Sequence, residues 1–299
     1  HFYVQKNVSL LTNYVQKNVL NNHFYVQKNV SNIMERFVLQ RLKEWKERKD
    51  RKPLIVNGAR QVGKTWALRE FAKREYAKEA YIICRKNELV EQVFKQDFNV
   101  ERILLSLSAI INVDITPGDT LIILDEVQEI PEAIEALKYF CENAPEYHIA
   151  VAGSLLGISL HHDVSYPVGK VNEIDMYPMS YGEFLLAKGE KQCYQLLEEQ
   201  NFEITNLLHE KYVDLLRQYY YVGGMPEAVK KYVESGALKE VRRIQKEILK
   251  GYERDFSKHS PKEQIERIKM VWRSIPSQLF KNNKKFIYGV LRQGARAKD

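Results

Sequence analysis

The chain has 299 residues, a hydrophobic fraction of 44% and a charged fraction of 28%, which is typical of a globular protein with one large or two smaller domains. No run of about 18 apolar residues occurs, which excludes a membrane-spanning helix, and the N-terminus lacks the pattern of a secretory signal. The three cysteines (Cys84, Cys141 and Cys193) are too scattered to indicate a zinc site, so we expect reduced cysteines in a cytoplasmic protein.

The net charge of +7 is concentrated at the two ends of the chain. Residues 1–33 contribute +3 and residues 281–299 contribute +5, so residues 34–280 carry −1. A basic end can contact a phosphate backbone, but it is more often a solvated face. The overall charge therefore does not by itself indicate a nucleic-acid-binding protein.

The first element is a repeat, in which YVQKNV begins at Tyr3, Tyr14 and Tyr25. Its 11-residue period is compatible with a right-handed helical supercoil. However, Tyr, Val and Asn are poor helix formers, and near-identical copies indicate recently duplicated DNA translated ahead of a start at Met34. We favour the second interpretation, in which residues 1–33 are not part of the fold.

Residues 34–49 are expected to form a helix. Its apolar face would contain Phe37, Leu39, Leu42 and Trp45.

A phosphate-binding loop follows this helix. Pro53 to Asn57 is a short apolar run typical of a buried strand, and the next eight residues, GARQVGKT, match the pattern GxxxxGK[ST]. A helix is predicted after the loop, with its buried face formed by Ala67, Leu68, Phe71, Ala72 and Tyr76. The order strand, glycine loop, helix is the context that this motif requires.

Each residue type in the loop has a physical role. Gly58 and Gly63 allow the backbone N–H groups to converge on phosphate oxygens at the positive end of the next helix. Lys64 is expected to reach the β- and γ-phosphates, and Thr65 to offer its hydroxyl to Mg²⁺. The predicted nucleotide-binding residues here are Gly58, Ala59, Arg60, Gln61, Val62, Gly63, Lys64, Thr65 and Trp66.

A second apolar strand, TLIIL from Thr120, ends in Asp125 and Glu126. Asp125 is predicted to hold Mg²⁺, and Glu126 to act as the general base toward the attacking water. A third strand, from Tyr147 to Ala152, is followed by Gly153 and Ser154. Because ligands bind beyond the carboxyl ends of parallel strands, Ser154 is placed to sense the γ-phosphate, although serine is also a common turn residue.

The overall pattern predicts an α/β fold with a mostly parallel sheet. Strands near residues 53, 80, 120 and 147 alternate with helical segments up to about residue 190. Residues 191–258 are expected to be all-helical. From Pro261 onward we expect one more helix and then a short strand near residues 286–288.

Together these segments resemble the AAA-type P-loop ATPases of bacteria and archaea that carry a C-terminal domain of unknown function. The matching segments are GARQVGKT (58–65), LIILDEVQEIP (121–131), AGSLLG (152–157), YPVGKV (166–171), MYPMSYGEFL (176–185), YYYVGGMPEAV (219–229) and IPSQLFKNNKKFIYGVLRQGARA (275–297). The resemblance runs from about residue 34 to the last residue, and it implies an ATPase core at 34–190, a helical lid at 191–260 and the start of a truncated C-terminal domain at 261–299. The repeat segment at 1–33 is expected to lie outside the fold because of its repeated sequence. In the family, the residues beyond this point resemble a nuclease.

The resemblance also implies that Gly224 and Pro226 pack near the adenine, although both residues also suit a simple helix start. The chain departs from the family in two places. Relatives usually have an acidic residue at the strand end occupied here by residues 81–86, and they often have an arginine at the position of Lys170. Lys170 and Arg254 are therefore two weak candidates for a cation that senses phosphate across a subunit boundary.

Two functions remain open at this stage. The first is ATP hydrolysis with ATP and Mg²⁺ as cofactors, driving an unknown task on a protein or nucleic-acid partner, in a chain that could form a homo-oligomer. The second is a nucleotide-gated binding switch with negligible turnover, which the lysine at position 170 and the missing C-terminal part favour.

Overall fold

The computed structural model describes residues 34–153, 166–259, 262–280 and 285–290. Its contacts divide the chain into two compact units, of which the first ends at Val241 and the second begins at Arg242. The repeat at 1–33 lies outside the described residues. Its interpretation and the predicted domain boundaries therefore stay predictions.

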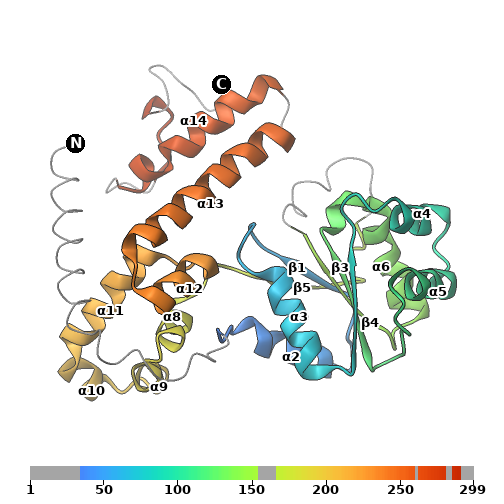
Figure 1. Ribbon diagram of the computed structural model, residues 1–299, viewed down its shortest axis with the longest axis horizontal. Coiled ribbons are helices and arrows are strands. Elements are labelled where there is room, and N and C mark those ends of the chain that lie inside the picture. The colour runs from blue at the N-terminus through green and yellow to red at the C-terminus, as the bar shows by residue number, and fades with distance from the viewer. Residues whose placement is uncertain (1–33, 154–165, 260–261, 281–284, 291–299) are drawn as a thin grey trace. The chain divides into compact units, whose positions relative to one another are not determined.

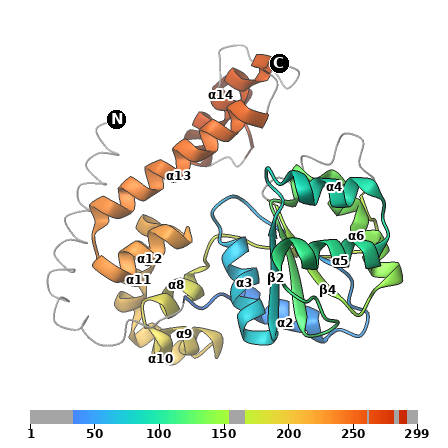
Figure 2. The same cartoon turned by 45° about the vertical axis from the view of Figure 1, so that its right-hand side comes forward.

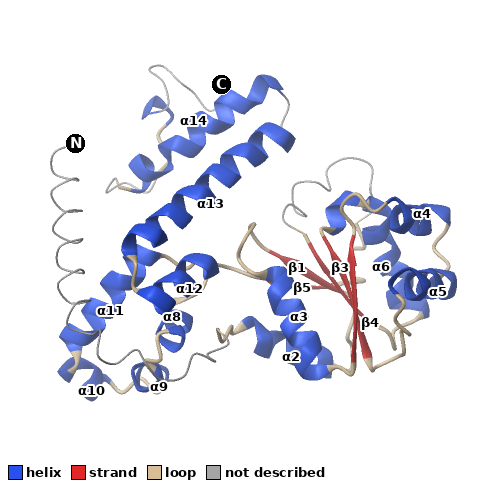
Figure 3. Cartoon of the chain, viewed as in Figure 1, coloured by secondary structure: helices blue, strands red, loops and turns tan. Residues whose placement is uncertain are grey.

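The first unit is built on a parallel five-stranded sheet (Figure 3), which confirms the predicted α/β fold. The strand order is β2-β3-β4-β1-β5. The strands are β1 (Leu54–Asn57), β2 (Lys78–Ile83), β3 (Thr120–Asp125), β4 (His148–Ala152) and β5 (Asn172–Asp175). The edge strand β5 was not predicted, because its sequence NEID contains a single apolar residue.

Helices cover both faces of this sheet and bury two separate apolar clusters (Figure 1). One face packs against α4 (Glu88–Gln96), α5 (Val100–Ile111) and α6 (Pro131–Asn143). The other face packs against α2 (Val38–Glu47) and α3 (Lys64–Glu75). Residues alternate between the two clusters along each central strand, as expected for strands buried on both sides.

The register of the sheet brings the predicted site residues to one edge. Asp125, the last residue of β3, lies opposite Ala152, the last residue of β4. The phosphate loop leaves the sheet from Asn57, the last residue of β1, which is the next strand along. All three strands therefore deliver their following residues to the carboxyl edge of the sheet.

The predicted helix at 34–49 is shorter than expected, because α2 begins at Val38 and ends at Glu47. The preceding residues form tertiary hydrogen bonds instead: the Phe37 backbone N–H donates to the Glu183 carboxylate. Leu39, Leu42 and Trp45 are buried as predicted, but Phe37 is 37% exposed and does not belong to the buried face.

The rest of the first unit is helical. After a 3₁₀ turn at η1 (Val127–Glu129) within the core, the chain continues beyond β5 into α8 (Tyr181–Ala187), α9 (Lys191–Glu198), α10 (Phe202–Leu207), α11 (His209–Val222) and α12 (Pro226–Ser235). These helices and α13 (Leu238–His259) confirm the all-helical prediction for residues 191–258.

The second unit contains most of α13, then α14 (Lys262–Leu279) and a 3₁₀ turn, η2 (Tyr288–Val290). In both views α14 lies beside α13 (Figure 2), with Trp272 against Tyr252 and Phe256. The predicted strand near residues 286–288 is wrong. The Gln278 side chain pairs with the N–H and C=O of Ile287 and satisfies the backbone groups that a strand would have used. No described helix is both long and apolar enough to span a bilayer.

Candidate functional site

The phosphate loop joins β1 to α3 through backbone conformations that favour glycine. Gly58 has φ 149° and Gly63 has φ 93°, and Gln61 between them is also left-handed at φ 64°. A Cβ atom on Gly58 would collide with the carbonyl oxygen of Met176. The two glycines that define the motif are thus required by backbone geometry, as predicted.

Lys64 is the first residue of α3, and its side chain turns back into the loop. The ammonium donates hydrogen bonds to the carbonyls of Gly58 at 2.7 Å and Ala59 at 2.9 Å, and the residue is 9% exposed. Burial lowers the pKa of Lys64, while the nearby carboxylates of Glu126 and Asp125 oppose that shift. A phosphate chain in the same place would further stabilise the charged form.

Thr65 and Asp125 meet although 60 positions separate them in the sequence. The Thr65 hydroxyl donates to Asp125 Oδ2 at 2.7 Å, and the Tyr81 hydroxyl donates to the same oxygen at 2.9 Å. The other carboxylate oxygen, Oδ1, accepts from the Glu126 backbone N–H at 3.0 Å. Hydroxyl and carboxylate oxygens are the ligands that Mg²⁺ prefers, so this pair fits the predicted metal site.

Glu126 follows Asp125 in a left-handed conformation with φ 53°. For a residue other than glycine this conformation is uncommon, and it often marks a functional position. The half-buried carboxylate accepts a hydrogen bond of 2.5 Å from the Gln128 side chain. The geometry therefore fixes the predicted general base beside the predicted metal ligand.

The two predicted lid residues lie against the core. Gly224 packs so closely on the chain at Met179 that a Cβ would collide with the Met179 carbonyl, and its own carbonyl accepts from the Met179 N–H at 2.6 Å. Pro226 begins α12, and its Cγ is 3.7 Å from the position that a Cβ on Gly63 would occupy. The start of α12 thus borders the phosphate loop, and the adenine contact stays a prediction.

The remaining predicted residues do not join this group within the described chain. Ser154 lies outside the described residues. Lys170 precedes β5 at the amino end of the sheet and pairs with Glu142 at 2.9 Å, so within one chain it does not face the phosphate loop. Arg254 is an exposed residue of α13 in the second unit. A role for either cation across a subunit boundary stays a prediction.

Within the loop, Arg60 contributes positive charge near Lys64, which lowers the pKa of Lys64 slightly further. Trp66, on the first turn of α3, is 37% exposed. Its predicted nucleotide contact stays a prediction.

Three residues beside the site were not anticipated. Tyr81 donates to Asp125, while Arg36 and Glu183 form a buried ion pair of 3.0 Å next to the loop. The sequence did contain one signal, because Ser180 and Glu183 form the S-x-x-E capping box that begins α8. No local sequence pattern indicated a role for Arg36 or Tyr81, because their hydrogen-bond partners lie far away in the sequence.

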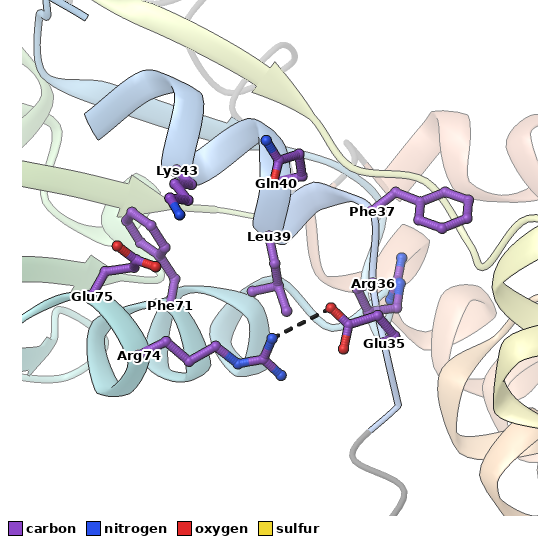
Figure 4. Close-up of a pocket in the computed structure, with 9 residues that line it drawn as sticks. All are labelled: Glu35, Arg36, Phe37, Leu39, Gln40, Lys43, Phe71, Arg74 and Glu75. Atoms are coloured by element: carbon purple, nitrogen blue, oxygen red, sulfur yellow. Dashed lines mark hydrogen bonds and ion pairs between the residues drawn. The ribbon is translucent and has the colours of Figure 1, made fainter. Parts of the chain in front are cut away.

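A separate pocket lies between α2 and α3 (Figure 4), and none of the predicted site residues lines it. An ion pair between Arg74 and Glu35 crosses it at 3.4 Å. Its lining residues are Glu35, Arg36, Phe37, Leu39, Gln40, Lys43, Phe71, Arg74 and Glu75. Among the described residues, no group of three or more His, Cys, Asp or Glu side chains could hold a metal ion.

Comparison with protein families identifies two regions. The family described as "AAA domain" matches residues 50–185, and the family described as "Domain of unknown function (DUF8612)" matches residues 213–299. The second match overlaps the predicted lid and reaches the last residue. No curated protein was found to match the chain.

Solved structures give weak similarities. PCH-2 of C. elegans is 13% identical with a TM-score of 0.30, over 54% of this chain and 45% of its own. ORC1 of Aeropyrum pernix, solved in complex with DNA, is 18% identical with a TM-score of 0.33, over 51% and 48%. AMPPCP-bound DnaA of Aquifex aeolicus is 13% identical with a TM-score of 0.38, over 88% and 83%. This chain thus spans less than half of the first two proteins, and at these TM-scores no function can be transferred from any of the three.

Proposed function

We propose that this chain, whose residues 50–185 match the family described as "AAA domain", binds ATP with Mg²⁺ and hydrolyses the ATP. The observation that carries the proposal is the 2.7 Å hydrogen bond between Thr65 and Asp125. This bond joins the phosphate loop to the acidic end of β3. Phosphoryl transfer requires both a loop that binds the phosphates and acidic residues that hold the metal and activate the water.

Binding rests on the loop and the start of α3. The backbone N–H groups around Gly63 and the helix N-terminus attract the phosphate oxygens, and Lys64 adds a full positive charge. Thr65 and Asp125 would hold Mg²⁺. When bound, that ion supplies positive charge to the β- and γ-phosphate oxygens. Gly224 and Pro226, beside the loop, support an adenine contact with the start of α12.

Hydrolysis rests on Glu126. We propose that its carboxylate takes the proton of a water molecule as the water oxygen bonds to the γ-phosphorus and the bond to the β-phosphate oxygen breaks. The hydrogen bond from Gln128 and the left-handed backbone hold this carboxylate in place. The products are ADP and inorganic phosphate.

The test compares three variants of the full chain. Glu126→Gln is expected to keep ATP affinity within about twofold and to lower turnover by about 100-fold or more. Lys64→Ala is expected to lose ATP binding. The matched control is Glu129→Gln, an exposed acid of the same 3₁₀ turn, which is expected to leave both quantities unchanged. Turnover by Glu126→Gln at the unaltered rate would contradict the assignment of the base.

The second candidate is a nucleotide-gated switch with negligible turnover, acting on a protein or nucleic-acid partner. It is favoured by the position of Lys170, which pairs with Glu142 at the opposite end of the sheet from the phosphate loop. Micromolar ATP binding with turnover far below about 1 per second would support the switch. If the partner is DNA, the affinity should fall steeply with salt, and a flat salt response would exclude that partner.

A further inference from the structure

Arg36 is a buried arginine at the edge of the proposed nucleotide site, and it is only 3% exposed. It lies just before α2, where the chain enters the core beside Glu35 (Figure 4). The AAA domain match begins at residue 50, so Arg36 lies outside the matched region. A buried guanidinium is costly unless its N–H groups are bonded, so its partners indicate what it is for.

The three nitrogens of Arg36 bind three different segments. Nη1 donates to the Val62 carbonyl at 2.8 Å, and Nη2 donates to the Tyr177 carbonyl at 2.8 Å. Nε donates to the Glu183 carboxylate at 3.0 Å. One side chain thus connects the phosphate loop, the segment after β5 and the helix α8.

The bond to Val62 fixes the orientation of one peptide group of the loop. In a trans peptide, the C=O of one residue and the N–H of the next point in opposite directions. When Arg36 holds the Val62 carbonyl, the Gly63 N–H is therefore directed away from Arg36. Gly63 tolerates either orientation because it lacks a side chain, so an outside contact is needed to select one.

Glu183 fixes Arg36 in turn. Its Oε1 accepts from both Arg36 Nε and the Phe37 N–H, while its Oε2 accepts from the Ser180 N–H that begins α8. The carboxylate is therefore bonded on both oxygens. Removing either partner of such a buried pair leaves an uncompensated charge, which makes the pair sensitive to small changes.

We propose that Arg36 is a positioning residue. It holds the Val62–Gly63 peptide so that the Gly63 N–H can bind the second or third phosphate of a nucleotide. Glu183 on α8 keeps the Arg36 side chain in this position. This role rests on the proposed nucleotide binding. It extends the functional unit to residue 36 and makes phosphate affinity depend on the attachment of α8.

The test measures the affinity of the full chain for AMP, ADP and ATP by calorimetric titration, for the unaltered protein and for Arg36→Lys. Lysine keeps the charge but cannot form the three directed bonds. ADP and ATP affinity are expected to fall about tenfold or more, as for the loss of a charged hydrogen bond, and AMP affinity to change less than about twofold. The matched control is Arg41→Lys on α2, where an exposed arginine donates a single bond to the Asp175 carbonyl, and no affinity is expected to change.

The dependence on phosphate number separates positioning from a merely structural role. A general loosening of the fold would weaken all three nucleotides equally, and that result, or unchanged ADP and ATP affinity, would overturn the proposal. If Arg36→Lys does not fold, Glu183→Gln is titrated instead, and the same loss confined to ADP and ATP is expected. Absence of binding by the unaltered chain would overturn the proposed function and this role together, whereas normal binding with an unaffected variant would overturn the role alone.

Discussion

The two ends of the parallel sheet use different chemistry. At the amino end, Trp45, Phe71, Tyr76 and His148 pack ring against ring, and the Tyr76 hydroxyl shares a 2.7 Å hydrogen bond with His148 Nδ1. These rings are largely buried, and burial lowers the pKa of His148 to about 4.

At the carboxyl end, charged and hydroxyl groups replace the rings. Lys64 donates to a carbonyl of the phosphate loop. Asp125 accepts from the hydroxyls of Thr65 and Tyr81, and Glu126 accepts from the Gln128 side chain. The amino end therefore has the features of a stabilising core, and the carboxyl end has those of the proposed binding site. Substitutions at the amino end should therefore change unfolding, and substitutions at the carboxyl end should change affinity for ligands.

The largest effect on stability is expected for Phe71→Ala at the amino end. Phe71 is 1% exposed and contacts both Trp45 and Tyr76, so its loss leaves a cavity between α3 and the sheet. We expect the free energy of unfolding to fall by about 3–5 kcal/mol, measured by urea denaturation. Leu105→Ala, at a position that is 73% exposed, is the control and should change it by less than about 0.5 kcal/mol. A small effect of Phe71→Ala would mean that the aromatic end is not the stabilising one.

The next largest effect on the free energy of unfolding is expected when the pH is lowered, and it arises from His148 at the amino end. Burial, followed by the charges of Arg51 and Lys46, lowers the pKa of His148 to about 4, from an ordinary value of about 6.5. The unfolded chain therefore takes up a proton below about pH 6.5 that the folded chain does not accept until about pH 4. The free energy of unfolding should fall as the pH falls through this window. The total loss should be less than about 3 kcal/mol, because solvent screens part of the interaction.

This acid response is measured as the urea midpoint between pH 7 and pH 5, above the range in which most carboxylates titrate. His148→Gln removes the titrating group and should flatten the slope in that range. An equal slope in both proteins would show that His148 is not the group responsible.

A smaller effect on stability is expected at the carboxyl end from Tyr81→Phe. The change removes the hydroxyl that donates to Asp125 and keeps the ring, over which the Arg69 guanidinium lies at 4.8 Å. Unfolding free energy should fall by about 1 kcal/mol, while the Mg²⁺ concentration for half-maximal ATP binding should rise about threefold to tenfold. Tyr139→Phe, whose ring stacks on Phe98 in the other layer, is the control. If stability falls but the Mg²⁺ concentration for half-maximal binding does not change, Tyr81 contributes to stability and not to the proposed metal site.

The smallest effect is expected for Lys170→Ala. Its ion pair with Glu142 is partly exposed, so its removal should change the unfolding free energy by less than about 1 kcal/mol. Turnover by one isolated chain should not change, because Lys170 lies at the amino end of the sheet. A fall in turnover that appears only at protein concentrations where chains associate would support the role across a subunit boundary. A fall at every concentration would contradict the division between the two ends.

The sequence was sufficient for the elements whose signals are local. The phosphate loop was predicted because strand, glycines and helix follow one another within residues 53–76, and the strand ending in Asp125 because its apolar run stops at two acids. The edge strand β5 and the start of α2 were missed or misplaced. Both are set by neighbours in space: β5 pairs with β1, and the chain before α2 bonds to Glu183.

The predicted strand near residue 287 failed for a related reason. A short apolar run is compatible with a strand, but the backbone of Ile287 found its partner in the side chain of Gln278. Ser154 lies outside the described residues, so its role stays a prediction from the sequence.

The sequence by itself thus determined which chemical groups the candidate site contains. They occur in two patterns, a glycine loop between a strand and a helix and an apolar strand that ends in two acids, and few other sites need both. The residues concerned are Gly58, Lys64, Thr65, Asp125 and Glu126. The tertiary structure alone decided how that chemistry is held. Arg36 and Glu183 are 147 positions apart, and they meet only because β5 and α8 return the chain to the phosphate loop. Local preferences extend over one element, whereas a buried ion pair or a shared carboxylate depends on the packing of several elements.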